Sequence, residues 1–194
     1  MRSVLRGGGH NDAWMVLLML CAVVLVSQSR DAAAGAAWAL AGAVKAVALA
    51  LLALQLLGSR RGLRISAAAV TAGIAVASIA TFGVASVIGP WQLHQREARY
   101  SLPARLEQLA LPEALAHAIA YGVLALGVVW LARHALRSRP RLALGASLLI
   151  LTTPWVLPWY STWPIALAAV DEDGLSQGVA LGVALYLLPD RMLL

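Results

Sequence analysis

The feature that most constrains this chain is a series of long apolar stretches separated by short basic ones. The apolar stretches cover residues 13–26, 32–57, 65–88, 114–132, 142–156, 165–170 and 175–188. A helix needs about 20 apolar residues to cross the hydrocarbon core of a bilayer, and several stretches approach or exceed that length. The sequence therefore predicts an all-α, polytopic transmembrane bundle. We expect about five to seven hydrophobic helices, some short or re-entrant, in one transmembrane domain over residues 1–194.

The composition supports a membrane protein and excludes several other classes. Only 12% of the residues are charged, whereas a soluble domain carries about 25%. The net charge of +6 comes from basic residues between apolar stretches, where they act as topology signals, so no nucleic-acid partner is expected. Cys21 is the only cysteine, which excludes an intramolecular disulfide and a cysteine metal cluster. A bias toward Ala, Leu, Gly, Val and Arg suggests a GC-rich bacterial genome. Together with the apolar stretches, it favours a bacterial inner membrane as the location.

Lys45 interrupts the second apolar stretch and leaves two topologies open. As one crossing helix, residues 32–57 would place Lys45 near mid-membrane, at a cost of several kcal/mol. As a hairpin that reverses at Lys45, they would place Arg30 on the same side as the basic segments 60–64 and 133–141. The positive-inside rule puts those segments in the cytoplasm and favours the hairpin. Residues 10–12, 92–113 and 154–164 then face the outside, and Lys45 points toward the same face.

Three segments carry a resemblance to a known enzyme class. They are residues 7–15 (GGGHNDAWM), residues 39–45 (ALAGAVK) and residues 154–164 (PWVLPWYSTWP). In this order and spacing they resemble the C-terminal half of GT-C-type membrane glycosyltransferases, in particular the bacterial polyprenyl-phosphate-mannose-dependent alpha-1,6-mannosyltransferases. The resemblance extends over about residues 7–188. It implies transfer of a hexose, with mannose favoured, from a polyprenyl-phosphate donor to an extracytoplasmic glycolipid or glycan.

The same resemblance implies that part of the catalytic machinery lies elsewhere. Such enzymes usually carry their catalytic carboxylate in a first extracytoplasmic loop near the N-terminus. The chain is therefore expected to be an N-terminally truncated homologue, with a partner chain supplying the missing helices. Two alternatives stay open: a non-catalytic scaffold or assembly subunit, and a small-molecule or lipid transporter. A transporter predicts paired charges within the membrane, or a repeated half with broken helices.

The resemblance assigns roles to several residues, and each has a simpler structural interpretation. Asp12 is expected to bind sugar hydroxyls or to assist the base, and His10 and Asn11 to hydrogen-bond a substrate; alternatively, Asn11 or Asp12 caps the helix that follows. Lys45 is expected to hold the donor phosphate. Its alternatives are a lysine that extends to the interface and a lysine paired with a buried acid.

An aromatic segment near residue 160 is expected to contact sugars. It comprises Trp155, Trp159, Tyr160 and Trp163, and its alternative role is an aromatic belt in the headgroup region. The prolines in this segment argue against one regular helix, and irregular backbone at membrane depth is tolerated where it is buried or lines a cavity.

Two further groups of charged residues complete the candidates. The connection 92–113 is expected to hold a short amphipathic helix at residues 102–111. It also carries His94, Arg96, Arg99 and Arg105, which are either phosphate ligands or parts of a solvated loop. The acids Asp171, Glu172 and Asp173 form either a divalent-cation site or, as favoured, a polar turn. No cofactor is expected, and the sequence has no P-loop, dinucleotide-binding or zinc-protease motif.

Overall fold

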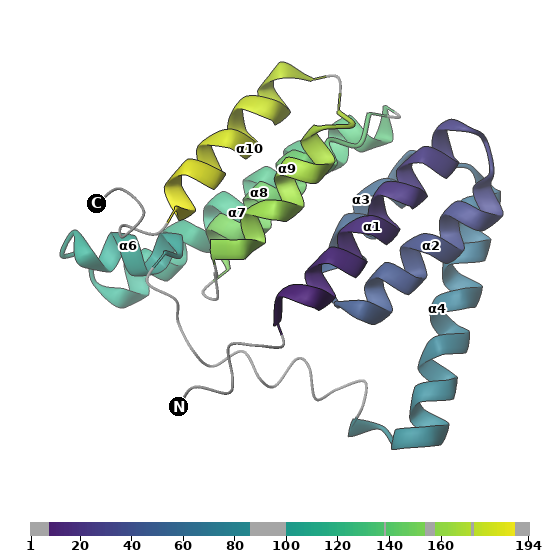
Figure 1. The fold of residues 1–194 in the computed structure, drawn as a ribbon. Helices are drawn as coiled ribbons and strands as arrows, with labels where there is room; N and C mark the ends of the chain where they lie inside the picture. The colour runs from purple at the N-terminus through teal and green to yellow at the C-terminus, as the bar shows by residue number, and fades with distance from the viewer. Residues whose placement is uncertain (1–7, 86–99, 138, 154–157, 172, 189–194) are drawn as a thin grey trace. The chain divides into compact units, whose positions relative to one another are not determined.

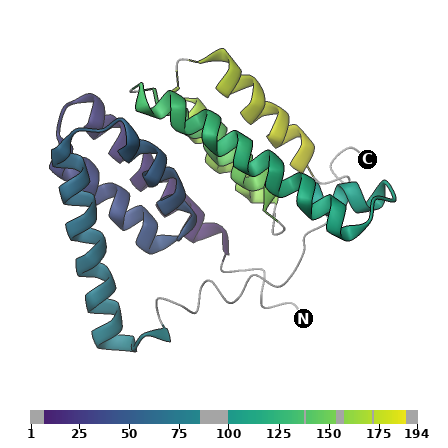
Figure 2. The ribbon, with the colours of Figure 1, turned by 180° about the vertical axis from the view of Figure 1, so that it is seen from behind.

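The computed structural model describes residues 8–85, 100–137, 139–153, 158–171 and 173–188, with the side chains of residues 8–10 and 158 excepted. All regular structure in these ranges is helical, which confirms the predicted all-α class. The chain divides into two compact units, Met1–Gln95 and Arg96–Leu194. Figures 1 and 2 show the helices of each unit packed side by side.

The described part of the first unit, residues 8–85, contains four helices. They are α1 (Gly8–Ser27), α2 (Asp31–Val44), α3 (Val47–Leu57) and α4 (Arg61–Phe82). Helix α2 packs against both α1 and α4. The core of this unit is formed by Met15 and Met19 of α1, Trp38 of α2 and Leu51 of α3, all nearly or fully buried. The core is therefore centred on α2.

A close approach of two backbones joins α2 to α4. A Cβ placed on Gly35 would lie 2.7 Å from the backbone oxygen of Leu63 and 2.7 Å from the backbone nitrogen of Ala67. No side chain other than hydrogen fits at this point, because backbone atoms do not move aside as the end of a flexible side chain does. Gly35 therefore sets the distance between the two helices.

Helices α2 and α3 form the predicted hairpin, with its reversal at Lys45. The Ser66 hydroxyl donates to the carbonyl of Ala32, at the start of α2, at 2.5 Å. Arg64, on the same turn of α4, donates from Nε and Nη2 to the carbonyls of Leu56 and Leu57, at the end of α3. The start of α2 and the end of α3 therefore lie at the same end of α4. Residues 32–57 therefore form two helices joined at Lys45 rather than one continuous helix.

The hairpin helices are short for a membrane. At 1.5 Å per residue, the 14 residues of α2 extend about 21 Å and the 11 residues of α3 about 17 Å. Both are shorter than the roughly 30 Å hydrocarbon core. Within the described part of the chain, α4 and α7 (Glu113–Leu136) are the helices long and apolar enough to cross, and both are mostly exposed.

The second unit is built around α8. The other elements among its described residues are α6 (Leu102–Gln108), α7, the 3₁₀ helix η2 (Pro158–Ser161), α9 (Thr162–Ala168) and α10 (Gly174–Leu187). Residues 142–147 of α8 (Leu142–Thr152) are buried on every side, as expected for a helix that is apolar all round. A short helix is observed where residues 102–111 were expected to form one: it is α6, which ends before Ala110 with its left-handed φ of 64°.

The chain also turns back on itself between α8 and α9. Arg141 Nε, just before α8, lies 3.4 Å from Asp173 Oδ2, just before α10. Because Asp173 follows α9 by a few residues, the end of α9 returns to the start of α8. Each unit thus contains a pair of short helices that meet at one end.

Candidate functional site: an ion pair at the hairpin reversal

Lys45 and Asp12 form an ion pair where α2 ends. Lys45 Nζ lies 2.6 Å from Asp12 Oδ1, within hydrogen-bond distance. The Asp12 side chain is 4% exposed and the Lys45 side chain 24% exposed. A charged residue inside an apolar bundle is costly unless it is paired, and this pairing removes much of that cost. It also gives the pair one accessible member, the lysine.

The local backbone explains why Lys45 stands at the reversal. Lys45 adopts an extended conformation, with φ −154° and ψ 120°, which ends α2. Its N–H still donates to Ala41 O, and its carbonyl accepts from Ala48 N, the first bond of the next helix. Both backbone polar groups are therefore satisfied, as an apolar environment requires. The chain reverses here without glycine or proline, because the backbone N–H of Lys45 bonds to α2 and its carbonyl bonds to the start of α3.

The predicted cap at the start of α1 is wrong. Helix α1 begins at Gly8, so Asn11 and Asp12 lie inside the helix rather than at its N-cap. Asn11 is exposed, whereas Asp12 is turned toward Lys45. A cap would need the Asp12 carboxylate to accept from a backbone N–H, whereas this carboxylate pairs with Lys45 instead. The side chain of His10 lies outside the described part of the structure.

The opposite end of the hairpin collects the basic residues. Ser66 and Arg64 join this end, as described above, and Asp31 lies close to Gly62 at the start of α4. Arg64 donates to carbonyls at the C-terminus of α3, where a positive charge is favoured by the helix dipole. The first unit therefore has a basic end and an end that holds the Asp12–Lys45 pair.

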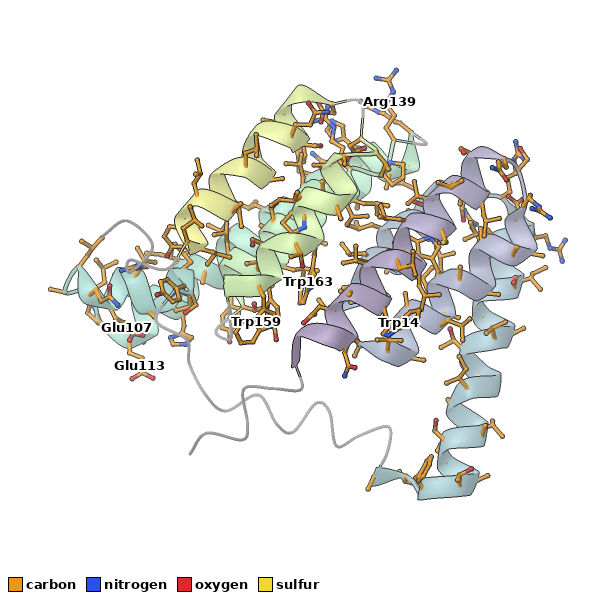
Figure 3. All side chains as sticks on the ribbon, in the orientation of Figure 1. Trp14, Glu107, Glu113, Arg139, Trp159 and Trp163 are labelled. Atoms are coloured by element: carbon orange, nitrogen blue, oxygen red, sulfur yellow. The ribbon has the colours of Figure 1, made fainter. Side chains whose placement is uncertain are left out.

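The aromatic segment is mostly buried in the second unit. Tyr160 and Trp163 are each 3% exposed and stack on one another, with ring centroids 4.2 Å apart. Trp159 is 37% exposed and meets Tyr160 edge to face. Figure 3 shows Trp159 and Trp163 close together at one end of η2 and α9. Trp155 lies outside the described residues, so Trp159 is the most exposed of the described members.

In the acidic turn between α9 and α10, Asp173 has a structural role. Asp173 accepts from Leu175 N and Ser176 Oγ, which caps α10, and it pairs with Arg141. The hydrogen bond from Ser176 lowers the pKa of Asp173, whereas burial raises the pKa of Asp171. Glu172 is not among the described residues. Among those that are, no three His, Cys, Asp or Glu side chains are placed to hold a metal ion.

Two contacts near α6 were not expected from the sequence. Arg105 donates a hydrogen bond to Tyr186 of α10, and its guanidinium group lies over the rings of Tyr100 and Tyr186. The spacing of these residues in the sequence does not predict the contacts. His117 Nδ1 lies 3.8 Å from Glu107 Oε1 and 3.0 Å from the carbonyl of Glu113. The other predicted phosphate ligands of this connection, His94, Arg96 and Arg99, fall outside the described residues.

These features define an all-helical protein of the membrane type with a charged pair enclosed in its first unit. The model of glycosyltransferase family 87 matches residues 6–158, which is more than half of the chain and includes both Asp12 and Lys45. The chain belongs to this family. Comparison with curated proteins and with solved structures gives no match.

Proposed function

We propose that this membrane glycosyltransferase moves a hexose, mannose in the first instance, from a polyprenyl-phosphate donor to an extracytoplasmic glycolipid or glycan. The observation that carries the proposal is the Asp12–Lys45 pair within a chain of a glycosyltransferase family. The proposed location is the bacterial inner membrane, in a multi-pass topology. The basic segments 60–64 and 133–141 would face the cytoplasm.

In this proposal Lys45 stabilises the leaving phosphate. The acceptor oxygen forms a bond to C1 of the sugar, the bond from C1 to the phosphate oxygen breaks, and the phosphate leaves with the electron pair. An ammonium group placed at the developing phosphate charge lowers the barrier, because its geometry is fixed before the reaction begins. A general base takes the acceptor proton, and we place this base in a partner chain that supplies further helices.

Asp12 then acts as a positioning residue. Its carboxylate is enclosed behind Lys45, and the exposed fractions of 4% and 24% make the lysine the member that a ligand meets first. The role differs from the assisting carboxylate that the resemblance implied. His10 and Asn11, one turn or less away, stay proposed as hydrogen-bonding groups for a substrate. Trp159 stays proposed as a stacking surface for a sugar, with Tyr160 and Trp163 supporting it.

The test is a transfer assay on purified protein in lipid, with radiolabelled polyprenyl-phosphate mannose and a mannoside acceptor. We expect Lys45→Met to reduce kcat by about 100-fold or more, as loss of one preorganised charge-stabilising donor does. Asp12→Asn should reduce kcat less, because Lys45 keeps its charge. Asp31→Asn, an acid at the opposite end of the hairpin, is the matched control and should transfer normally.

The double variant Asp12→Asn/Lys45→Met separates function from folding. It leaves no uncompensated charge in the bundle, so it should insert and unfold like the natural chain. If it folds but does not transfer sugar, Lys45 serves the reaction. Transfer at the natural rate would reduce the pair to a structural element. A second comparison tests the source of the general base. If the folded natural chain transfers no sugar alone but does so with added cell membranes, the base comes from a partner. No transfer in either condition favours a non-catalytic scaffold.

A transporter is the second candidate, and two observations favour it. The first is the paired charge of Asp12 and Lys45, and the second is the presence of short, reversing helices in each unit. Transporters often place broken helices and paired charges at their binding sites. Reconstitution into liposomes distinguishes the two functions, since a transporter moves labelled lipid or sugar across the bilayer without forming a glycosidic bond.

A further inference from the structure

Arg105 is held in place by neutral groups alone. Its Nε donates to the Tyr186 hydroxyl at 3.1 Å and its Nη1 to Gln108 Oε1 at 2.9 Å. The guanidinium carbon lies 5.5 Å from the ring centre of Tyr100 and 5.6 Å from that of Tyr186. Tyr186 in turn donates to the carbonyl of Tyr100 at 2.8 Å. The arginine is therefore fixed between two tyrosine rings that are themselves joined.

The charge of Arg105 has no acidic counterpart among the described side chains. The ion pairs in the described part of the chain are Lys45–Asp12, His117–Glu107 and Arg141–Asp173. A guanidinium carries five N–H donors. Within the described structure, the two hydrogen bonds above use two of these donors, so three are left that can bind a ligand. A planar set of donors with a fixed orientation suits the oxygens of a phosphate group.

Arg105 lies beside one of the helices that are long and apolar enough to cross a membrane. Helix α6 packs on α7, one of the two helices able to cross a membrane, near the first residue of α7. Figure 3 shows Glu107 and Glu113 at this end of the second unit and Arg139 at the other. Exposed apolar side chains occur on the same two elements, with Leu109 at the end of α6 72% exposed and Leu115 in the first turn of α7 50% exposed. Tyrosine rings at this position match the aromatic belt of the headgroup region.

We propose that Arg105, clamped by Tyr100 and Tyr186, binds the phosphate of a bilayer phospholipid and so anchors α6 in the headgroup layer. The exposed leucines select a lipid over a soluble phosphate, because they bury apolar surface only when acyl chains are present. This site lies within the second unit and goes beyond the transfer reaction proposed above. Its ligand is a structural lipid rather than a sugar donor.

The test uses the full chain in detergent, titrated with phosphatidylglycerol and followed by native mass spectrometry. Diacylglycerol, which lacks the phosphate, and inorganic phosphate, which lacks the chains, are the comparison ligands. We expect phosphatidylglycerol to bind at least tenfold more tightly than diacylglycerol. Arg105→Gln should weaken phosphatidylglycerol binding about tenfold, as loss of a charge-assisted contact does. Arg137→Gln, an exposed arginine at the far end of α7, is the matched control and should bind normally.

Two further variants keep the result interpretable. Tyr186→Phe retains the ring and removes the acceptor of Arg105 Nε, so it should weaken binding less than Arg105→Gln without disturbing the fold. Arg105→Lys keeps the charge but loses the fork, and should restore only part of the affinity. Equal phosphatidylglycerol binding by Arg105→Gln and the natural chain would overturn the proposal. Arg105-dependent binding of inorganic phosphate as tight as that of the lipid would also overturn it, in favour of a soluble phosphate ligand.

Discussion

Lys45 Nζ reaches Asp12 Oδ1 at 2.6 Å across 33 residues of sequence, and the contact joins the reversal of the α2–α3 hairpin to the first turns of α1. Removing Lys45 leaves the Asp12 carboxylate enclosed in an apolar bundle, whereas removing the Asp12 charge leaves a lysine that is partly exposed. We expect Lys45→Met alone to lower the free energy of unfolding by about 3 kcal/mol, and Asp12→Asn alone to lower it less. The double variant should lose much less than the sum of the two. A double-mutant cycle in thermal or denaturant unfolding measures this coupling, and additive losses would contradict it.

The close approach at Gly35 gives a second prediction. Gly35→Ala places a methyl group against the backbone of Leu63 and Ala67, so α2 and α4 must separate. We expect a loss of about 1–3 kcal/mol in the free energy of unfolding, as overpacking costs elsewhere. The control is Gly73→Ala, because nothing lies within 4 Å of a Cβ at Gly73. That change should be neutral or stabilising by up to about 1 kcal/mol, from helix propensity. Similar losses at both glycines would refute the close-contact explanation.

The hairpin predicts which surface residues share a side of the membrane. Ser29 precedes α2 and Ser59 follows α3, and the contacts of Ser66 and Arg64 bring these two ends together. Single cysteines at Ser29 and at Ser59, each in a Cys21→Ser background, should react with an impermeant thiol reagent from the same side. The natural cysteine must be removed first because it is exposed. Labelling from opposite sides would mean that residues 32–57 cross once.

Within the aromatic segment, we expect Tyr160 to have a structural role and Trp159 a binding role. Tyr160 is buried and stacked on Trp163, so Tyr160→Ala should lower the free energy of unfolding by about 3 kcal/mol or more. Trp159 is more exposed, and Trp159→Ala should cost no more than about 1 kcal/mol. If Trp159 stacks on a sugar, this variant raises KM while the melting temperature changes little. An unchanged KM would remove Trp159 from the site.

Asp171, in the turn between α9 and α10, is expected to make the stability of the protein depend on pH. Burial raises its pKa above that of an unfolded chain, and one of its oxygens, Oδ2, is enclosed without a hydrogen-bond partner in the described structure. The folded state therefore binds the proton more tightly, and stability falls as pH rises from the ordinary aspartate pKa to the raised one. Asp171→Asn should flatten the melting temperature across this acidic window and stabilise the protein above it.

The neighbours of Asp171 determine how this experiment is controlled. Asp173 and Arg141 also face the turn, and the pKa of Asp173 is lowered, so Asp173 contributes stability that is lost as pH falls. Asp173→Asn should therefore produce the opposite trend, with a weaker pH dependence at the acidic end and lower stability at neutral pH. Identical profiles for the two variants would show that the turn responds as one unit rather than through the burial of Asp171.

The all-helical class and most of the helix positions could be predicted from the sequence, because apolar length and breaks in hydropathy are local properties. The short helix at residue 102 and the final helix were predicted from such signals, and the structure has them. The reversal at Lys45 was favoured over a single crossing by the positions of the basic segments, and the structure has it too. The resemblance marked Asp12 and Lys45 as candidates, and Lys45 also stood out as a charge within an apolar stretch. The sequence placed Asp12 wrongly as a cap, since a cap and a partner for a distant lysine need the same residue type.

Which polar groups meet could not be predicted, because it depends on how the helices pack. Nothing local links Asp12 to Lys45, Arg105 to Tyr186, or Arg141 to Asp173, and each pair depends on how the helices of its own unit pack. Packing also buried Tyr160 and Trp163 and left Trp159 more exposed, although all three belong to one aromatic pattern. The physical reason is that hydropathy fixes which segments become helices, whereas side-chain shape, as at Gly35, fixes how helices approach one another and therefore which charges are paired.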